Sequence, residues 1–150
     1  MNRIVCTLRE MGYRLTPQRR AVIDALSECG GFTDASVIFG KVRLTNEHIS
    51  LDTIYRNLKL LIELGVVNQI NNPRSDRTLY ELITDSPHQH AVCLACGKIE
   101  CIDHCTEMVD NMVRLASDGF KVVNHSFEAY GYCAECQKKQ LREDKNDSGI

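Results

Sequence analysis

Four cysteines in the second half of the chain form two pairs with metal-ligand spacing, Cys93-x2-Cys96 and Cys133-x2-Cys136. Each pair can place two thiolates on one knuckle, and four thiolates make a closed tetrahedral site that suits Zn²⁺. Such a site has no open position for catalysis, so the spacing predicts a structural zinc. Redox-active Cys-x-x-Cys motifs are the alternative interpretation.

A second cluster mixes ligand types, and its members are Glu81, His88, His90 and Cys101. In an extended segment His88 and His90 point to the same side, as a chelating pair must. The two histidines lie between two predicted domains, so a metal bound there would fix one domain against the other. The cluster therefore predicts a regulatory metal site, with exposed linker histidines as the alternative. Three more candidates lie within possible reach: His104, Cys105 and His125.

Residues 1–84 have the pattern of a winged-helix domain. Apolar periodicity and capping residues predict helices over residues 2–12, 17–29, 35–42 and 51–64. Two strands, at 66–70 and 78–83, follow with a polar turn between them. Helices that end in a hairpin are typical of a winged helix, whose last helix enters the DNA major groove.

The sequence pattern predicts that the rest of the chain forms a hinge, a small domain and a tail. Residues 85–90 form the predicted hinge, residues 91–137 a zinc-containing domain, and residues 138–150 a charged, flexible tail. The small domain is predicted to contain strands near 90–94, 98–102 and 120–129 and a helix near 105–117. Because it has few large apolar side chains, it needs a metal, a partner subunit or both. The predicted fold class is α+β.

Charge and composition narrow the class of function. The formal net charge of the whole chain is −2, but its first half is basic. Residues 1–84 contain eleven Lys or Arg and nine Asp or Glu. This asymmetry favours an anionic partner, such as DNA, for the first half only. The chain contains no apolar run long enough to span a membrane and no export signal, so we expect a cytoplasmic protein. Phosphate loops, nucleophile elbows and paired carboxylates are absent from the sequence, which argues against an enzyme.

Four segments resemble the ferric uptake regulator family in order and spacing over about residues 3–137: GYRLTPQRRAVIDAL, ISLDTIYRNLKLLIELGVV, HQHAVCLACGKIE and FKVVNHSFEAYGYCAEC. The resemblance implies a homodimeric, metal-responsive repressor with a winged-helix domain and an α/β dimerisation domain. Metal would hold it closed on a palindromic A/T-rich DNA operator. The resemblance also implies the DNA contacts: Thr53, Tyr55 and Arg56 from the recognition helix, Arg14 in the minor groove, and Arg19 on a phosphate.

Two departures from the family pattern bear on the metal. Phe32 stands where relatives supply a histidine, and Cys101 stands where they usually supply a carboxylate. The remaining sulfur, nitrogen and oxygen ligands suit tetrahedral zinc better than six-coordinate iron or manganese. A further family site falls on Pro87, Gln89, Met108 and His125, where only the histidine can ligate, so we expect that site to be absent. We therefore predict a zinc uptake regulator with one structural and one regulatory Zn²⁺ per protomer.

Three alternatives remain open at this point. The same scaffold could sense iron, manganese or peroxide. Cys101 and Cys105, four residues apart, could form a disulfide that releases DNA if the predicted helix begins after Cys101. A zinc-stabilised adaptor that binds no DNA is the third, although the basic first helices argue against it. Cys6 and Cys29 have no neighbours at metal-ligand spacing, so we expect each to act only as a small apolar side chain.

Overall fold

The computed structural model describes residues 2–83, 89–102, 114 and 128–139, and these divide into two compact units. Among the described residues, the first unit contains 2–71 and 77–83, and the second contains 72–76, 89–102, 114 and 128–139. None of the helices in these ranges has the length and apolar character needed to cross a bilayer.

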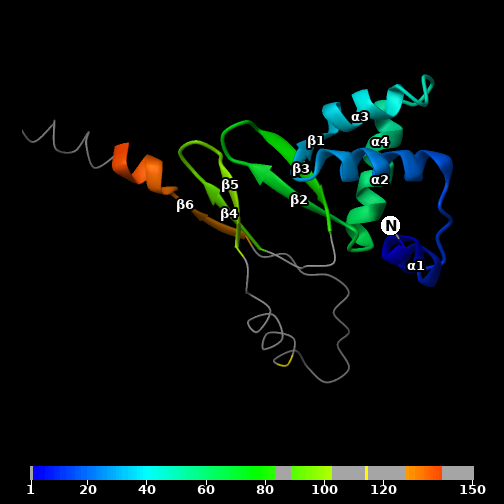
Figure 1. Ribbon diagram of the computed structural model, residues 1–150, viewed down its shortest axis with the longest axis horizontal. Helices are drawn as coiled ribbons and strands as arrows, with labels where there is room; N and C mark the ends of the chain where they lie inside the picture. The colour runs from blue at the N-terminus through cyan, green and yellow to red at the C-terminus, as the bar shows by residue number, and fades with distance from the viewer. Residues whose placement is uncertain (1, 84–88, 103–113, 115–127, 140–150) are drawn as a thin grey trace, which may run out of the picture. The chain divides into compact units, whose positions relative to one another are not determined.

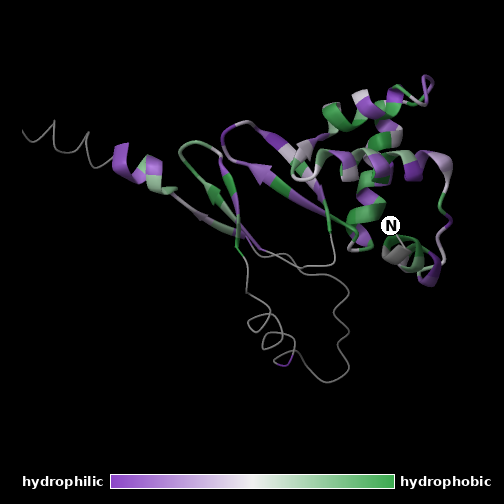
Figure 2. Ribbon diagram, viewed as in Figure 1, coloured by the Kyte–Doolittle hydropathy of each residue, from purple (hydrophilic) through white to green (hydrophobic). Residues whose placement is uncertain are grey.

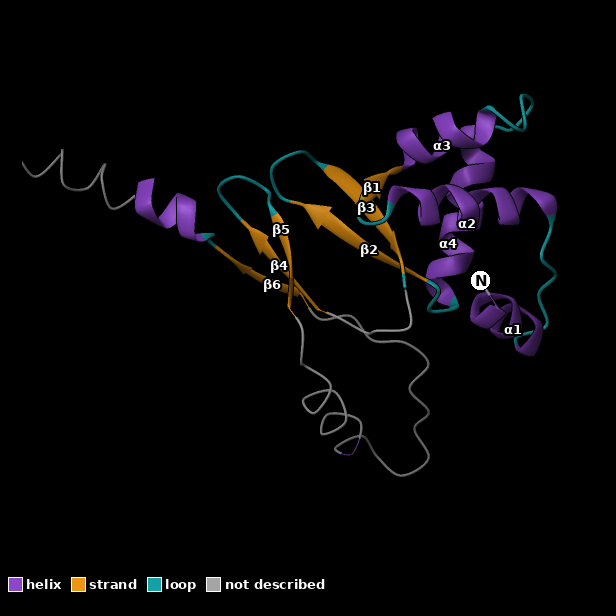
Figure 3. Ribbon diagram, viewed as in Figure 1, coloured by secondary structure: helices purple, strands orange, loops and turns teal. Residues whose placement is uncertain are grey.

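The first unit contains four helices and a three-stranded sheet (Figures 1 and 3). The helices are α1 (Asn2–Glu10), α2 (Pro17–Cys29), α3 (Ala35–Arg43) and α4 (Leu51–Glu63). The strands are β1 (Thr33–Asp34), β2 (Val67–Asn72) and β3 (Arg77–Leu82), in the spatial order β1-β3-β2. The helices and the β2–β3 hairpin follow the predicted winged-helix order. The two-residue strand β1, which pairs antiparallel with β3, was not predicted.

Capping residues, a proline and a glycine mark the points where these helices begin or end. The Thr16 side chain accepts a hydrogen bond from the Arg19 amide at 3.2 Å, and Pro17 occupies the first turn of α2. Gly30 ends that helix in the left-handed region with φ 65°. Ser50 caps α4 by accepting from the Thr53 amide at 3.2 Å. Each cap lies where the sequence pattern predicted a helix boundary.

The apolar faces of α2, α3 and α4 meet in one core, and Figure 2 shows their green faces. The largest fully buried side chains of this core come from the four helices and β2: Leu8, Val22, Ile23, Leu26, Ile38, Val42, Ile54, Leu58, Leu61 and Val67. Burying each side chain of this size contributes about 1.5–3 kcal/mol, so these residues together stabilise the first unit. The first unit thus has a hydrophobic core of its own.

The second unit contains a three-stranded sheet of β4 (Gln89–Cys93), β5 (Ile99–Ile102) and β6 (Glu128–Gly131), in the order β5-β4-β6. β4 runs antiparallel to β5 and parallel to β6. Residues 134–139 are helical. The structure differs from the sequence-based boundaries at two points. Gln89 and His90, which the domain prediction assigned to the hinge, are buried strand residues, and His90 lies at the start of the strand predicted near 90–94. The helix at 134–139 extends into the predicted tail.

Several sequence-based predictions fall outside the described residues. They are the hinge at 85–88, the helix near 105–117 apart from residue 114, the strand residues 120–127 and the tail beyond residue 139. Residue 114 is helical, in line with the predicted helix. The domain boundaries as a whole stay a prediction.

Asp34 joins three elements of the first unit. Its Oδ1 atom accepts hydrogen bonds from the amides of Ser36 and Val37 at 2.9 and 3.0 Å, which caps α3. Its Oδ2 atom pairs with Nη1 of Arg77 in β3 at 2.9 Å. These hydrogen bonds, first from the Ser36 hydroxyl and then from the Val37 amide, lower the pKa of Asp34. The carboxylate therefore stabilises the junction of α3 with the sheet in its charged form.

We expect Asp34→Ala to lower the free energy of unfolding by about 1–2 kcal/mol at neutral pH, because an N-cap and an ion pair are lost together. Since the folded-state pKa is lowered, this stabilisation is present above the ordinary aspartate pKa of about 3.9. It disappears as pH falls through the folded-state value. Urea unfolding followed by circular dichroism at several pH values measures the difference.

Asp24→Ala is the matched control, because Asp24 makes an exposed pair with Arg20 at 3.6 Å on α2. We expect a change within about 0.5 kcal/mol for this variant. Equal destabilisation by the two substitutions, or an Asp34→Ala effect that persists unchanged in acid, would contradict the capping role.

Candidate metal centre and candidate nucleic-acid interface

The four cysteines of the two pairs converge at one end of the second unit's sheet. The Sγ atoms of Cys93, Cys96, Cys133 and Cys136 all lie within 4.8 Å of one another. Cys93 ends β4, and its register partner on the parallel strand β6 is Gly131, two residues before Cys133. The pairing of these two strands therefore brings together cysteines that are far apart in the sequence.

The sulfur spacing fits a tetrahedral zinc site. The Sγ atoms of Cys96 and Cys133 are 3.8 Å apart. Zinc–sulfur bonds of about 2.3 Å in a regular tetrahedron give a sulfur–sulfur separation of about 3.8 Å. All four cysteines are free thiols in the structure. The donor set and its spacing thus fit a bound Zn²⁺ ion and not a disulfide.

A tight turn forms the first knuckle. The Gly97 amide donates to the Cys93 carbonyl at 2.8 Å, and the Cys93 amide donates to the Lys98 carbonyl at 2.9 Å. Gly97 has φ 74°, a conformation that side-chain-bearing residues rarely adopt. The glycine after the second cysteine therefore lets the chain reverse and begin β5.

Hydrogen bonding and sulfur–sulfur proximity set the protonation of the cluster. The Cys133 amide donates to Cys93 Sγ at 3.3 Å, and chiefly this bond lowers the pKa of Cys93 to about 6. The neighbouring sulfur of Cys133, followed by burial, raises the pKa of Cys136 to about 12. One thiolate therefore forms readily, whereas four close thiolates require a cation to offset their repulsion.

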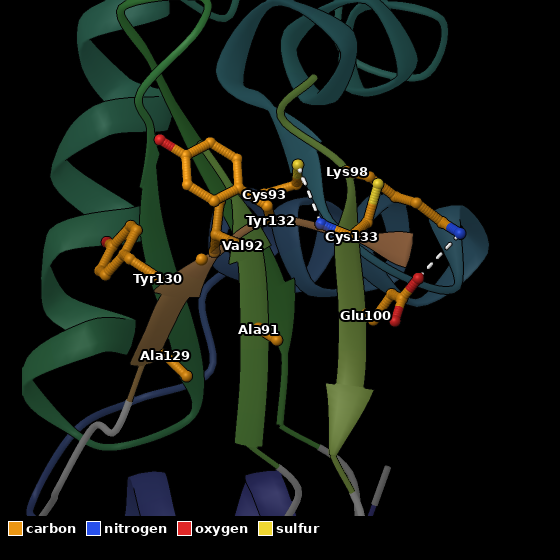
Figure 4. A pocket seen from close by; sticks show the side chains of 10 residues that line it. Ala91, Val92, Cys93, Lys98, Glu100, Ala129, Tyr130, Tyr132 and Cys133 are labelled. Atoms are coloured by element: carbon orange, nitrogen blue, oxygen red, sulfur yellow. Dashed lines mark hydrogen bonds and ion pairs between the residues drawn. The ribbon is translucent and has the colours of Figure 1, made fainter. Parts of the chain in front are cut away.

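A shallow pocket borders this cluster (Figure 4). Cys93 and Cys133 lie on its wall, and Lys98 pairs there with Glu100 at 2.8 Å. The pKa of Lys98 is raised, mainly by Glu100 and to a smaller extent by Glu135 and Cys133. The ammonium group adds positive charge beside an anionic tetrathiolate, and the other lining residues are mostly small or aromatic.

The mixed-ligand cluster is described in part. His90 on β4 and Cys101 on β5 are directly opposite in the antiparallel register, so their side chains share one face of the sheet. His90 is buried and Cys101 is exposed. Glu81 is a buried residue of β3 in the first unit, and His88 lies outside the described residues. The structure thus brings an imidazole and a thiol side by side.

Three residues considered as further ligands, His104, Cys105 and His125, also lie outside the described residues. Phe32 lies in the loop just before β1, close in sequence to the start of α3. Its side chain offers no metal ligand at this position.

The residues expected to contact DNA all belong to the first unit. Tyr55 and Arg56 are exposed on α4, and Arg56 forms an ion pair with Asp52 one turn earlier. Thr53 is half-buried, and its hydroxyl lies 2.9 Å from the Ser50 hydroxyl. Arg14 is exposed between α1 and α2, and Arg19 lies in the first turn of α2.

Sequence reasoning missed one cation on this helix. Lys59 is exposed on α4, four residues after Tyr55 and three after Arg56. Residues with this spacing lie on the same face of a helix, so the periodicity alone could have identified it.

Comparison with known proteins identifies the family. The sequence model described as "Ferric uptake regulator family" matches residues 10–130. The chain is 36% identical over 137 residues to the peroxide operon regulator of Bacillus subtilis, covering 89% of this chain and 91% of the relative. It is 33% identical over 137 residues to the peroxide-responsive repressor PerR of Staphylococcus aureus, covering 90% of each chain.

A solved structure of a zinc uptake regulator complexed with zinc and DNA is also similar. Its TM-score is 0.59 at 27% identity, and the match covers 89% of this chain and 90% of that chain. The family match spans both described units and includes Cys93, Cys96 and α4. Members of the family are metal-responsive, DNA-binding transcriptional regulators and not enzymes. The chain belongs to the ferric uptake regulator family.

Proposed function

We propose that this family member is a zinc-responsive repressor. The observation that carries the proposal is the position of Cys101 directly opposite His90 on the second unit's sheet. A thiolate beside an imidazole favours zinc over manganese or iron, which prefer sites richer in oxygen. Glu81, His88, His90 and Cys101 would hold the regulatory Zn²⁺, and Cys93, Cys96, Cys133 and Cys136 the structural Zn²⁺.

The proposed regulatory ligands belong to both units, and this division would supply the mechanism. Glu81 belongs to the first unit, whereas His90 and Cys101 belong to the second. Ligands that share one ion restrict the arrangement of the two units. If that arrangement is the one that binds DNA, zinc affinity and DNA affinity are coupled reciprocally.

The proposed DNA target is a palindromic, A/T-rich operator bound by a homodimer in the cytoplasm. Tyr55 and Arg56, exposed on α4, would read the major groove, where tyrosine can pack on thymine methyl groups. Thr53 would support them at the start of the helix. Arg14 would enter a narrow minor groove, which concentrates negative potential in A/T tracts. The family resemblance implies a phosphate contact for Arg19, which lies in the first turn of α2.

A second candidate is a peroxide-responsive repressor. The relatives from Bacillus subtilis and Staphylococcus aureus, at 36% and 33% identity over most of the chain, favour it. In such a regulator the residues of the regulatory site would hold Fe²⁺, and peroxide would oxidise one of these metal-binding side chains. Cys101 argues against this function, because the peroxide-sensing branch holds Fe²⁺ with carboxylates and imidazoles, and a thiolate stands here in place of a carboxylate.

A DNA-binding titration separates the two candidates. Protein that keeps only its four-cysteine zinc is mixed, at one fixed salt concentration, with DNA from upstream of its own gene. We expect buffered Zn²⁺ to switch on binding at far lower free concentration than anaerobic Fe²⁺ or Mn²⁺. Activation by Fe²⁺ or Mn²⁺, with none by Zn²⁺, would overturn the zinc proposal and leave the family assignment intact.

Cys101→Asp tests the ligand directly. We expect the zinc concentration for half-maximal DNA binding to rise by at least about tenfold, since loss of even an outer partner of a ligand costs about 10–100-fold. Response to Fe²⁺ or Mn²⁺ should improve. Cys6→Ser, which alters an exposed cysteine of α1, is the control and should leave both responses unchanged. An unaltered zinc response in Cys101→Asp would exclude Cys101 as a ligand.

Cys136→Ser tests the structural zinc. We expect purified wild-type protein to retain one zinc per chain after dialysis against a mild chelator and the variant to retain none. The second unit should unfold in the variant, because the energy of metal binding is part of its folding energy. Metal analysis and proteolysis measure both effects. A variant with wild-type protease resistance would show that the four cysteines are dispensable for this fold.

Arg56→Ala tests the recognition helix. We expect DNA binding to weaken by about 1–3 kcal/mol without any change in zinc content. Lys138→Ala removes an exposed cation from the helix at 134–139 and should leave DNA affinity unchanged. Equal weakening by both substitutions would indicate a general charge effect and not a specific contact.

A further inference from the structure

The segment between α1 and α2 is fixed at its first end by a paired hydrogen-bond pattern. The Gly12 amide donates to the Arg9 carbonyl at 3.0 Å, and the Tyr13 amide donates to the Leu8 carbonyl at 2.8 Å. Gly12 has φ 78°, as the left-handed residue of this helix-ending motif requires. Since the Leu8 side chain is fully buried, the motif ties Tyr13 to the core of the first unit.

Arg19 holds the same segment from the other end. Its amide donates to the Thr16 side chain, which caps α2, and its guanidinium turns back over the segment. There Nη1 donates to the Arg14 carbonyl, and Cζ lies 6.0 Å from the centroid of the Tyr13 ring. The Nε atom of Arg19 is buried. Much of this cation is therefore in contact with the protein itself.

The result is an immobilised Arg14 backbone with an exposed side chain. The Arg14 carbonyl accepts a second hydrogen bond, from the Thr16 amide at 3.1 Å, so both of its lone pairs are used. Leu15, the next residue, packs partly buried against the core. A fixed backbone reduces the backbone entropy that this segment loses when the Arg14 side chain binds in a groove.

We propose that Arg19 is a positioning residue that acts on DNA through Arg14, and not as the separate phosphate contact that the family resemblance implies. The proposal rests on the proposed function, in which Arg14 enters the minor groove of A/T-rich DNA. Lysine has the same charge as arginine but lacks the planar, multidentate group that bridges a carbonyl and a ring. A charge-preserving substitution therefore separates positioning from phosphate contact.

The test uses the full-length, zinc-loaded protein and two DNA duplexes. The first is DNA from upstream of the protein's own gene. The second has the same sequence with 2,6-diaminopurine for adenine, which adds to the minor groove an amino group of the kind that guanine carries. Fluorescence anisotropy at one fixed salt concentration gives both affinities, and their ratio reports minor-groove recognition. The variants are Arg14→Ala, Arg19→Lys and the double substitution, with Arg20→Lys as the control.

We expect the wild-type protein to prefer the unmodified duplex by about tenfold. Arg14→Ala and Arg19→Lys should each lose most of this preference, and the double variant should lose no more than either one, because residues that act as a unit are not additive. Arg20→Lys should behave as wild type, since Arg20 is exposed and pairs only loosely with Asp24.

Retention of the preference by Arg19→Lys, or additive losses in the double variant, would falsify the positioning role. Absence of any preference in the wild-type protein, or full preference in Arg14→Ala, would instead show that the proposed minor-groove contact itself is wrong. Tyr13→Leu provides a second route if Arg19→Lys fails to fold. It leaves Arg19 in place and removes the ring beneath it, and it should lose the preference that Tyr13→Phe retains.

Discussion

Mutual repulsion among four converging sulfurs is the constraint on which the second unit depends. The strands β4, β5 and β6 are short, and a sheet of this size with few large apolar side chains buries little surface. Its topology nevertheless brings both cysteine pairs to one end. Without a cation, adjacent sulfurs keep Cys136 protonated, as its raised pKa shows. A divalent ion would offset this repulsion, and its bonds to the four sulfurs would stabilise the fold of the unit.

The first unit follows a different physical principle. Its helices bury an apolar core of their own, and capping side chains satisfy the first amides of α2, α3 and α4. It therefore has no need of metal for its fold. This separation suits a regulator, because the state of a metal site can change without unfolding the part that recognises DNA. In the proposed function, zinc at the regulatory site would alter the relation between the two units and leave the first unit folded.

The sequence was informative where local chemistry determines structure. The cysteine spacing indicated a four-thiolate site, and the residues Thr16, Gly30 and Ser50 marked helix boundaries that the structure contains. The sequence was uninformative where pairing between distant residues determines the structure. Thr33 and Asp34 form a strand only because they pair with Tyr80 and Leu79, and no pattern predicts so short a strand. Gln89 looks like a polar linker residue, yet pairing with Ile102 of β5 makes it a strand residue. The contact of Arg19 with Tyr13 was equally invisible, because a side chain's direction depends on folded surroundings.

The parallel pairing of β4 with β6 also has a consequence for the order of events during synthesis. Parallel neighbours cannot be joined by a tight turn, so the partner of Cys93 is supplied by a strand about forty residues later in the chain. During translation the first unit emerges complete while the tetrathiolate site still lacks two of its ligands. A polypeptide that stops before Cys133 would contain every described helix of the first unit and be unable to complete the set of four sulfurs. Retention of metal by all four cysteines would therefore require a chain that extends through Cys136.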